Sequence, residues 1–596
     1  MSSSGTIGDA ADRRGFALES TLVVLLVMSA LAVIAFAGVI SAIRTTNIDY
    51  RNTRVSYAAE AGAEAVMAQV YDNLHDGQLT GAELAALTPP VIPGFTVDSF
   101  KASKVGPVTI ETIANGPFAG LYSLTQRIEI YSRAKDAADH RSAAIVDVKA
   151  QAIPLFQFGV FFEKGLEIFN SPPMTFGGRV HTNGNLWLSS DNAWYNEMIT
   201  TPNKLFRDKT YGHAVLDGVY INDAGGTAVA LLFDSRTIPG AAAFRARSEA
   251  DFDSRLQTDA FAVDSLKLPI PAGMDPIELL MPRAFTDPPE LQEAKFSWRA
   301  DWYIEVRLDQ ITSAGKTTCP QALNTRTVGK LLPNNTDCKK IFSFTWDAFF
   351  DGRERRFVDV FEIDIDELRQ WVGASFSRRT EVLYVTFIGT PPGGVDLRGD
   401  GYRPVVRLRK GSRLPNALTV ATDRPLYIQG DYNTNTWVPA ALGSDAITWL
   451  SNAWNETQHQ CGSPYRPDLI AQTAICPGYA IYTASNTTVN AALVAGHIPT
   501  PCDHEDVGCP GGNYGGGLEN FPRHLERWSG ITMTYVGSLV SLHWSRIATG
   551  AWEYGTYYYP PGRNWQFDMR FRDPANLPPA TPVVGAVIHT AFRPVY

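Results

Sequence analysis

The 596-residue sequence lacks the short motifs that identify common enzyme classes. It has no Gly-x-Ser-x-Gly nucleophile motif, no glycine-rich phosphate-binding loop before a helix, and no His-Glu-x-x-His zinc motif. Basic residues are outnumbered, since 52 Lys and Arg face 61 Asp and Glu and give a net charge of −9. That balance argues against nucleic acid as a partner. We predict a protein that is not an enzyme and uses no cofactor.

Compact basic sequence occurs in only three places. Arg13 and Arg14 form the first, and the other two lie at residues 353–356 and 403–413. Basic residues in the two later runs alternate with apolar or acidic ones. We therefore interpret both runs as solvated faces of strands or loops.

Cysteine is scarce and confined to the second half of the chain. An even number of cysteines in an exported protein indicates disulfides, and joining nearest neighbours is the simplest of many connectivities. The alternative is a zinc site formed by Cys502, Asp503, His504, Glu505 and Cys509. We predict three disulfides and no metal. The six candidates pair as Cys319 with Cys338, Cys461 with Cys476, and Cys502 with Cys509.

No charged residue occurs from residue 21 to residue 43, and the interpretation of the rest of the chain starts from this apolar run. About 23 uncharged residues at ~1.5 Å each can cross the hydrocarbon of a membrane. The two preceding arginines keep the leader in the cytoplasm and predict export of the chain beyond the apolar run. Helix-forming sequence continues without proline to Leu74, so one helix of ~88 Å is expected from about Phe16.

These residues resemble the type IV pilin-like proteins, and in particular the PilX-like minor pilins of pilus assembly. A short basic leader that ends at Gly15, followed by Phe16 and an apolar helix, is similar to the family's prepilin peptidase and N-methylation signal. The resemblance implies cleavage after Gly15 and methylation of Phe16. Glu19 would be fourth in the mature chain, whereas the family's acidic residue is usually fifth, a shift of ~100° around a helix.

The resemblance extends beyond the apolar segment. The segment 57–64 is similar to the stretch that comes after the apolar run in these minor pilins, and parts of residues 154–190 and 415–575 are similar to large PilX-like proteins with β-rich C-terminal regions. It implies an inner-membrane protein that later joins an extracellular pilus, with other pilins, assembly proteins and the prepilin peptidase as partners.

Two other interpretations of the N-terminus remain open. One is an ordinary anchor or signal peptide. The other is twin-arginine export, because residues 13–16 also fit an Arg-Arg-x-Phe pattern and residues 35–37 are typical of a cleavage site.

Beyond the leader (residues 1–15) and the long helix (16–74), the chain divides into a small α/β region (75–153) and a large β-rich region (154–596). In the small region, alternating segments predict strands that pack against the second half of the helix, with Tyr57, Val66, Met67 and Val70 as packing residues. The fold class is α+β. Short apolar runs that end in Gly or Asn favour an irregular parallel β-helix in the large region, with a β-sandwich as the alternative.

Several polar groups are candidates for catalytic or binding sites. They are His181 with Asn183 and Asn185; Glu519 with His524 and Glu526; the acidic run Asp359, Glu362, Asp364, Asp366 and Glu367; and a calcium-like loop at Asp396, Asp400 and Gly401. For the other groups a structural role is favoured, whereas alternation in a strand puts Glu362, Asp364 and Asp366 on one face that we expect to be a solvated or cation-binding edge.

Aromatic residues crowd one stretch near the C-terminus, with Trp552, Trp565 and Phe567 among them. Such residues either stack on carbohydrate or seal the end of a β-fold. A surface or carbohydrate ligand therefore remains an open partner. We predict a minor-pilin-like structural component with a large exported domain for assembly, tip priming or adhesion. A membrane-anchored polysaccharide-binding protein or enzyme is the alternative.

Overall fold

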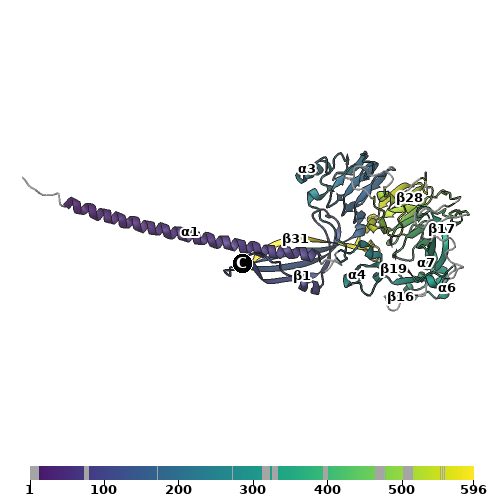
Figure 1. The fold of residues 1–596 in the computed structure, drawn as a ribbon, viewed down its shortest axis with the longest axis horizontal. Helices are drawn as coiled ribbons and strands as arrows, with labels where there is room; N and C mark the ends of the chain where they lie inside the picture. The colour runs from purple at the N-terminus through teal and green to yellow at the C-terminus, as the bar shows by residue number, and fades with distance from the viewer. Residues whose placement is uncertain are drawn as a thin grey trace, which may run out of the picture.

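The computed structural model describes residues 12–72, 79–170, 172–271, 273–311, 322–324, 333–393, 401–462, 476, 478–500, 514–550, 552, 555 and 557–595. A single helix, α1 (Asp12–Asp72), projects from one side of a much larger β-rich body (Figure 1). The expected long helix and mainly-β region are therefore confirmed. The helix is unbroken because the sequence from residue 12 to residue 72 contains no proline.

The second half of α1 packs on a four-stranded antiparallel sheet, which we call the head sheet. The strands lie along the helix in the order β1-β2-β3-β31 (Figure 1). The short helix α2 (Gly81–Ala86) follows α1. The strand bounds are β1 (Phe95–Thr112), β2 (Tyr122–Asp136), β3 (Arg141–Pro154) and β31 (Val583–Val595).

Small residues let α1 approach this sheet closely. Ala59, Ala63, Val66 and Val70 recur every three or four residues and are fully buried against it. At Gly62, an added Cβ atom would lie 2.5 Å from Ser132 Oγ. Tyr57 was expected to pack here, but it is 66% exposed because its neighbours Ala58 and Ala59 face the sheet instead.

The last strand of the chain belongs to the head. From the sequence, all of residues 154–596 were expected in one β-rich region, whereas β31 pairs with β3 from Ala143 to Pro154. Residues 155–582, which we call the stacked domain, are thus inserted between two neighbouring strands of the head sheet. The two connections run side by side, since Leu155 N–H donates to Pro582 O at 2.9 Å.

Successive turns of the stacked domain pair in parallel. Its largest sheet has eleven strands, and every pairing in it is parallel except β15 with β16. Parallel pairing between consecutive turns is what the β-helix expectation requires, whereas a sandwich of hairpins would give antiparallel pairs. In spatial order the strands are β14 (Leu256–Gln257), β10 (Ile199–Thr200), β7 (Arg179–Thr182), β4 (Phe158–Phe162), β29 (Leu539–Trp544), β26 (Ala492–His497), β23 (Ala440–Ser444), β21 (Leu418–Thr422), β19 (Val382–Ile388), β15 (Trp302–Arg307) and β16 (Ala322–Asn324).

Four smaller sheets form the other faces of the turns. The six-stranded sheet contains β17 (Phe342–Asp351), β18 (Arg356–Asp364), β20 (Pro404–Arg409), β22 (Leu426–Gln429), β24 (Ile447–Leu450) and β27 (Pro522–His524). The three others are β11 (Leu205–Phe206), β8 (Leu186–Leu188) and β5 (Leu166–Ile168); β13 (Ala228–Ala230), β12 (Asp217–Asn222), β9 (Ser190–Tyr195) and β6 (Met174–Phe176); and β25 (Thr487–Asn490), β28 (Thr532–Gly537) and β30 (Gly562–Phe567).

The chain enters and leaves this stack in its middle. From β4 it winds outward through β7 and β10 to β14, and then crosses to the opposite end, where it resumes at β15. It winds back to β29, which pairs with β4. Helices of the stacked domain lie in the connections: α3 (Ala241–Phe252), α4 (Pro289–Ala294), α5 (Phe296–Arg299), α6 (Asn335–Ile341) and α7 (Ile365–Gly373).

Candidate functional site: the free half of the long helix

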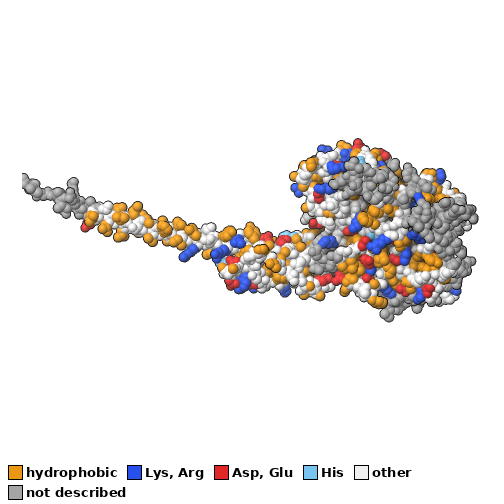
Figure 2. Space-filling view, viewed as in Figure 1, with side chains coloured by type: hydrophobic (Ala, Val, Ile, Leu, Met, Phe, Trp, Pro, Cys, Tyr) orange, Lys and Arg blue, Asp and Glu red, His pale blue; other side chains and the backbone are white. Residues whose placement is uncertain are grey.

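The first half of α1 contacts nothing else in the described chain. Every side chain from residue 18 to residue 54 is exposed, including large ones such as Leu22 at 61% and Phe36 at 72%. Figure 2 shows this free half covered by hydrophobic side chains along the part that projects from the body. An apolar surface of this extent is not stable in water, so it requires lipid or other apolar helices around it.

The sequence of α1 changes from uncharged to charged near the edge of the head. Arg44 is the first charged residue after Glu19, and Arg51 and Arg54 follow on the side of the body. The Arg54 guanidinium lies over the Phe95 ring, 5.3 Å from its centroid, and Val55 is the first buried side chain. The helix is long and apolar enough to cross a membrane, and the uncharged stretch spans ~34 Å at 1.5 Å per residue.

The residues expected to direct processing all lie within α1. Gly15 and Phe16 are in its first turns, and Glu19 is exposed on its surface. Cleavage at Gly15 and the role of Glu19 stay predictions.

His181 is held inside the stacked domain. Its ring nitrogens lie 2.8 Å from Thr200 Oγ1 and 3.1 Å from Asn183 Oδ1, and the imidazole stacks on Phe161. Burial lowers the pKa of His181 to about 4. Asn183 in turn donates to the Glu163 carboxylate and to Leu266 O. The group links neighbouring turns of the stack.

The second candidate group is not brought together by hydrogen bonding. The Glu519 carboxylate accepts the Phe169 N–H at 2.7 Å, whereas the Glu526 carboxylate accepts the N–H and the hydroxyl of Ser451, each at 2.7 Å. His524 lies between aromatic rings, with Trp449 edge-on. Burial raises the pKa of both carboxyls and lowers the pKa of His524.

The acidic run on β18 is neutralised by the neighbouring strand. Strand alternation puts Glu362 and Asp364 on one face, and parallel pairing sets them opposite Arg407 and Arg409 of β20. Arg407 and Arg409 both pair with Glu362. This face was expected to be solvated or cation-binding, but both carboxylates are buried and ion-paired.

The carboxylates of this run also make hydrogen bonds and ion pairs with nearby residues. Asp364 accepts the Glu367 N–H at 3.1 Å and so caps the N-terminus of α7. Asp366 binds Arg369 on the same helix. Asp359 accepts the N–H groups of Asp347 and Arg403.

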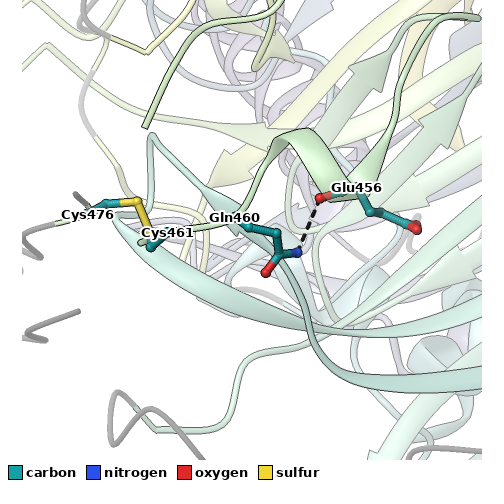
Figure 3. Close-up of a disulfide and its surroundings, with 4 residues drawn as sticks. All are labelled: Glu456, Gln460, Cys461 and Cys476. Atoms are coloured by element: carbon teal, nitrogen blue, oxygen red, sulfur yellow. Dashed lines mark hydrogen bonds between the residues drawn. A yellow bond between two sulfur atoms is a disulfide. The ribbon is translucent and has the colours of Figure 1, made fainter. Parts of the chain in front are cut away.

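Cys461 and Cys476 are joined by a disulfide, with their Cα atoms 4.9 Å apart (Figure 3). The pair is the one that the nearest-neighbour rule gives. Beside it, the Gln460 side chain donates to Glu456 O at 3.2 Å and closes the preceding turn. Cys338 is buried and also disulfide-bonded. Cys319, Cys502 and Cys509 lie outside the described residues, as do Asp503, His504 and Glu505 of the zinc alternative and Asp396 and Asp400 of the calcium-like loop.

The C-terminal aromatic stretch is largely internal. Trp565 and Phe567 are 7% and 8% exposed, and Tyr558 is buried as well. Trp565 packs edge-on against Trp449, and Phe567 belongs to the apolar cluster beside the head. These rings therefore fill the fold at this point.

Two features that shape the helix site were missed in the sequence. One is the contact of Gly62 with Ser132, and the other is β31. The apolar run 583–588 after a proline-rich segment is a strand signal that could have revealed β31. No sequence signal gives its partner, because the partner lies more than 400 residues earlier.

No family model and no curated protein matches the chain. Among solved structures, it is similar to the crystal structure of the competence-associated pilin ComZ from Thermus thermophilus. The two chains are 11% identical, the match covers 91% of this chain and 97% of that chain, and the TM-score is 0.27. A TM-score this low assigns neither a family nor a function.

Proposed function

We propose that the protein is a minor-pilin-like structural component of a type IV pilus or a related pseudopilus. The observation that supports this is the division of α1 into two halves. One half is apolar, uncharged and uncovered for the thickness of a membrane, while the other is fixed to a sheet that carries a large domain. Such a helix can lie in a bilayer and then exchange lipid for neighbouring helices without any change in the head.

The large domain has a non-enzymatic role in this proposal. The groups considered as catalytic candidates make contacts that join turns of the stack, which supports a structural use for them. The domain projects beyond the head, opposite the free helix (Figure 1), where it would be displayed for assembly, tip priming or adhesion.

Crosslinking tests the proposal directly. A photo-crosslinking residue at Leu26, on the free half, should capture other pilins in filament-producing cells. The same residue at Lys101, exposed on the head sheet, is the matched control. Immunogold labelling should place the stacked domain on sheared filaments, and mass spectrometry should find N-methyl-Phe16 as the mature N-terminus.

Other outcomes would favour different functions. A protein that stays in the inner membrane and crosslinks only to lipid would support the envelope-anchored alternative. A mature N-terminus near Gly38 would indicate an ordinary or twin-arginine signal peptide.

A further inference from the structure

Three neighbouring strands of the stacked domain end at a pocket of about 480 Å³. The strands are β4, β29 and β26, which pair in parallel, and their last residues Phe162, Trp544 and His497 line it. Glu167 of β5 and Asn185, just before β8, line it as well. The volume is in the range of sites that bind small molecules. The turns of the stack therefore form a ligand-sized cavity in which residues from distant parts of the sequence meet.

Trp544 is an exposed ring in this lining. It is 51% exposed, although the other five residues of β29 are buried. The backbone around it is fixed, because Trp544 pairs with His497 across the strands and the Ser545 N–H donates to His497 O at 3.0 Å. An exposed indole on a fixed backbone can stack on the apolar face of a ligand with little loss of conformational freedom.

Glu167 gives the pocket a carboxyl group. The Thr500 hydroxyl donates to Glu167 Oε2 at 2.7 Å, and Thr500 Oγ1 accepts the Gly515 N–H at 3.0 Å, so the direction of this hydroxyl is fixed. Burial raises the pKa of Glu167 to about 7. A carboxyl group has two oxygens, and one contact with a hydroxyl leaves capacity for further hydrogen bonds. Glu167 can therefore bind hydroxyl groups of a ligand.

Asn185 and His497 add further polar atoms. Asn185 Oδ1 accepts the Lys204 N–H at 3.2 Å, which leaves the amide NH₂ group to donate elsewhere. His497 Nδ1 lies 2.6 Å from Ser541 Oγ, which leaves Nε2. Burial lowers the pKa of His497 to about 4, so its ring is neutral at pH 7. Among the described residues, neither the Asn185 amide nitrogen nor His497 Nε2 has a hydrogen-bond partner.

The chemistry of this lining fits an uncharged ligand with many hydroxyl groups. Glu167 is partly protonated and His497 is neutral near pH 7. The Lys164 ammonium lies 5.9 Å from the Trp544 ring centroid, on an exposed and flexible side chain that a ligand can displace. A pyranose ring has an apolar C–H face and hydroxyl groups around its rim. We propose that this pocket binds a neutral hexose unit of a saccharide, stacked on Trp544 and hydrogen-bonded to Glu167, Asn185 and His497.

Saturation-transfer NMR on the full chain tests this site, in a detergent whose head group is not a sugar. The probes are methyl β-galactoside, methyl β-glucoside and methyl α-mannoside, and the open-chain alditol galactitol is the ligand control. At least one glycoside should bind, with the strongest transfer to the C–H protons of one ring face. Galactitol has the hydroxyl groups but no ring to stack, so it should bind at least tenfold more weakly.

Variants assign the binding to this pocket. Trp544→Ala should weaken glycoside binding at least tenfold, and Asn185→Ala should weaken it severalfold, both with little change in thermal unfolding temperature. Phe376→Ala removes a ring that is 86% exposed and outside the pocket lining, so it is the matched control and should bind as the native protein does. The proposal is overturned if no glycoside binds, if galactitol binds equally, or if Trp544→Ala binds normally.

This inference deepens the adhesion role proposed above and rests on that role for its biological use, but the two fail separately. Trp544→Ala should still crosslink to other pilins from Leu26, because the pocket lies in the stacked domain and not on α1. A protein that enters filaments and binds no glycoside would refute the site alone. A protein that binds glycosides through Trp544 and never enters filaments would refute the pilus assignment alone.

Discussion

At Gly62, α1 packs closely against the head sheet. Ser132 Oγ lies 2.5 Å from where a Cβ atom would be, but it is the tip of a side chain that can rotate. We expect Gly62→Ala to change stability little, because better helix propensity offsets the crowding. Gly62→Leu should destabilise the head by ~2 kcal/mol, since a large side chain cannot fit the closed helix–sheet contact. Denaturant unfolding measures both, and Ala61→Leu on the exposed neighbouring position should cost much less.

His181 should make the stacked domain sensitive to acid. Its pKa is lowered from 6.5 to about 4 in the fold, so the unfolded chain binds more protons between these values. Stability should fall as pH drops from 6.5 toward 4, by up to roughly 3 kcal/mol from this group. The neighbouring Glu163 acts in the opposite sense, because burial raises its pKa to about 7 and its cost disappears as the pH falls from 7 to 4.5.

A substitution of His181 separates its effect on stability from that of Glu163. The stability advantage of the native protein over His181→Gln should shrink between pH 7 and pH 4.5, when melting temperatures are compared across that range. An advantage that stays constant with pH would show that the imidazole titrates normally.

At the scale of elements, one prediction concerns the exposed surface of α1. Glu19 lies on the exposed surface of α1, one position away from the register of the resembling family. We therefore expect Glu19→Gln to lower incorporation into filaments only modestly. The ratio of the variant in sheared filaments to that in membranes measures this. Complete loss from filaments would show that its carboxylate pairs despite the shifted register.

The long helix could be predicted from the sequence because its signals are local: an uncharged run, helix formers and no proline. Short apolar runs that end in Gly or Asn were also visible in the sequence, and β22 (Leu426–Gln429), which is followed by Gly430, is one of them. Neither the order of the turns nor the position of β31 could be predicted. Both depend on contacts between residues hundreds of positions apart, for which one sequence has no local pattern.

At the scale of the whole molecule, the insertion of the stacked domain changes how the two parts can be separated. Truncation after residue 155 would remove β31 and uncover the edge of β3, a site for aggregation. Excision of residues 156–581 with a short turn between β3 and β31 should instead leave a folded head, because these strands are already antiparallel neighbours.

We expect the excised protein to be membrane-inserted, to crosslink with other pilins and to lose adhesion or tip function. Protease resistance measures whether the head is folded, and crosslinking from Leu26 measures contact with other pilins. A protease-sensitive head in the excised protein would mean that the head needs the stacked domain to fold.

The paired connections at Pro154 and Val583 also determine how the protein transmits force. The head strands lie along α1 (Figure 1), so tension between the anchored helix and the distal domain acts parallel to those strands. Both tethers are pulled in the same direction, and release requires β3 to slide past β2 along twelve registered residue pairs. Those backbone hydrogen bonds are loaded in shear and share the load, instead of opening one after another. A filament that carried this domain would hold it by a mechanical clamp built from the head sheet itself.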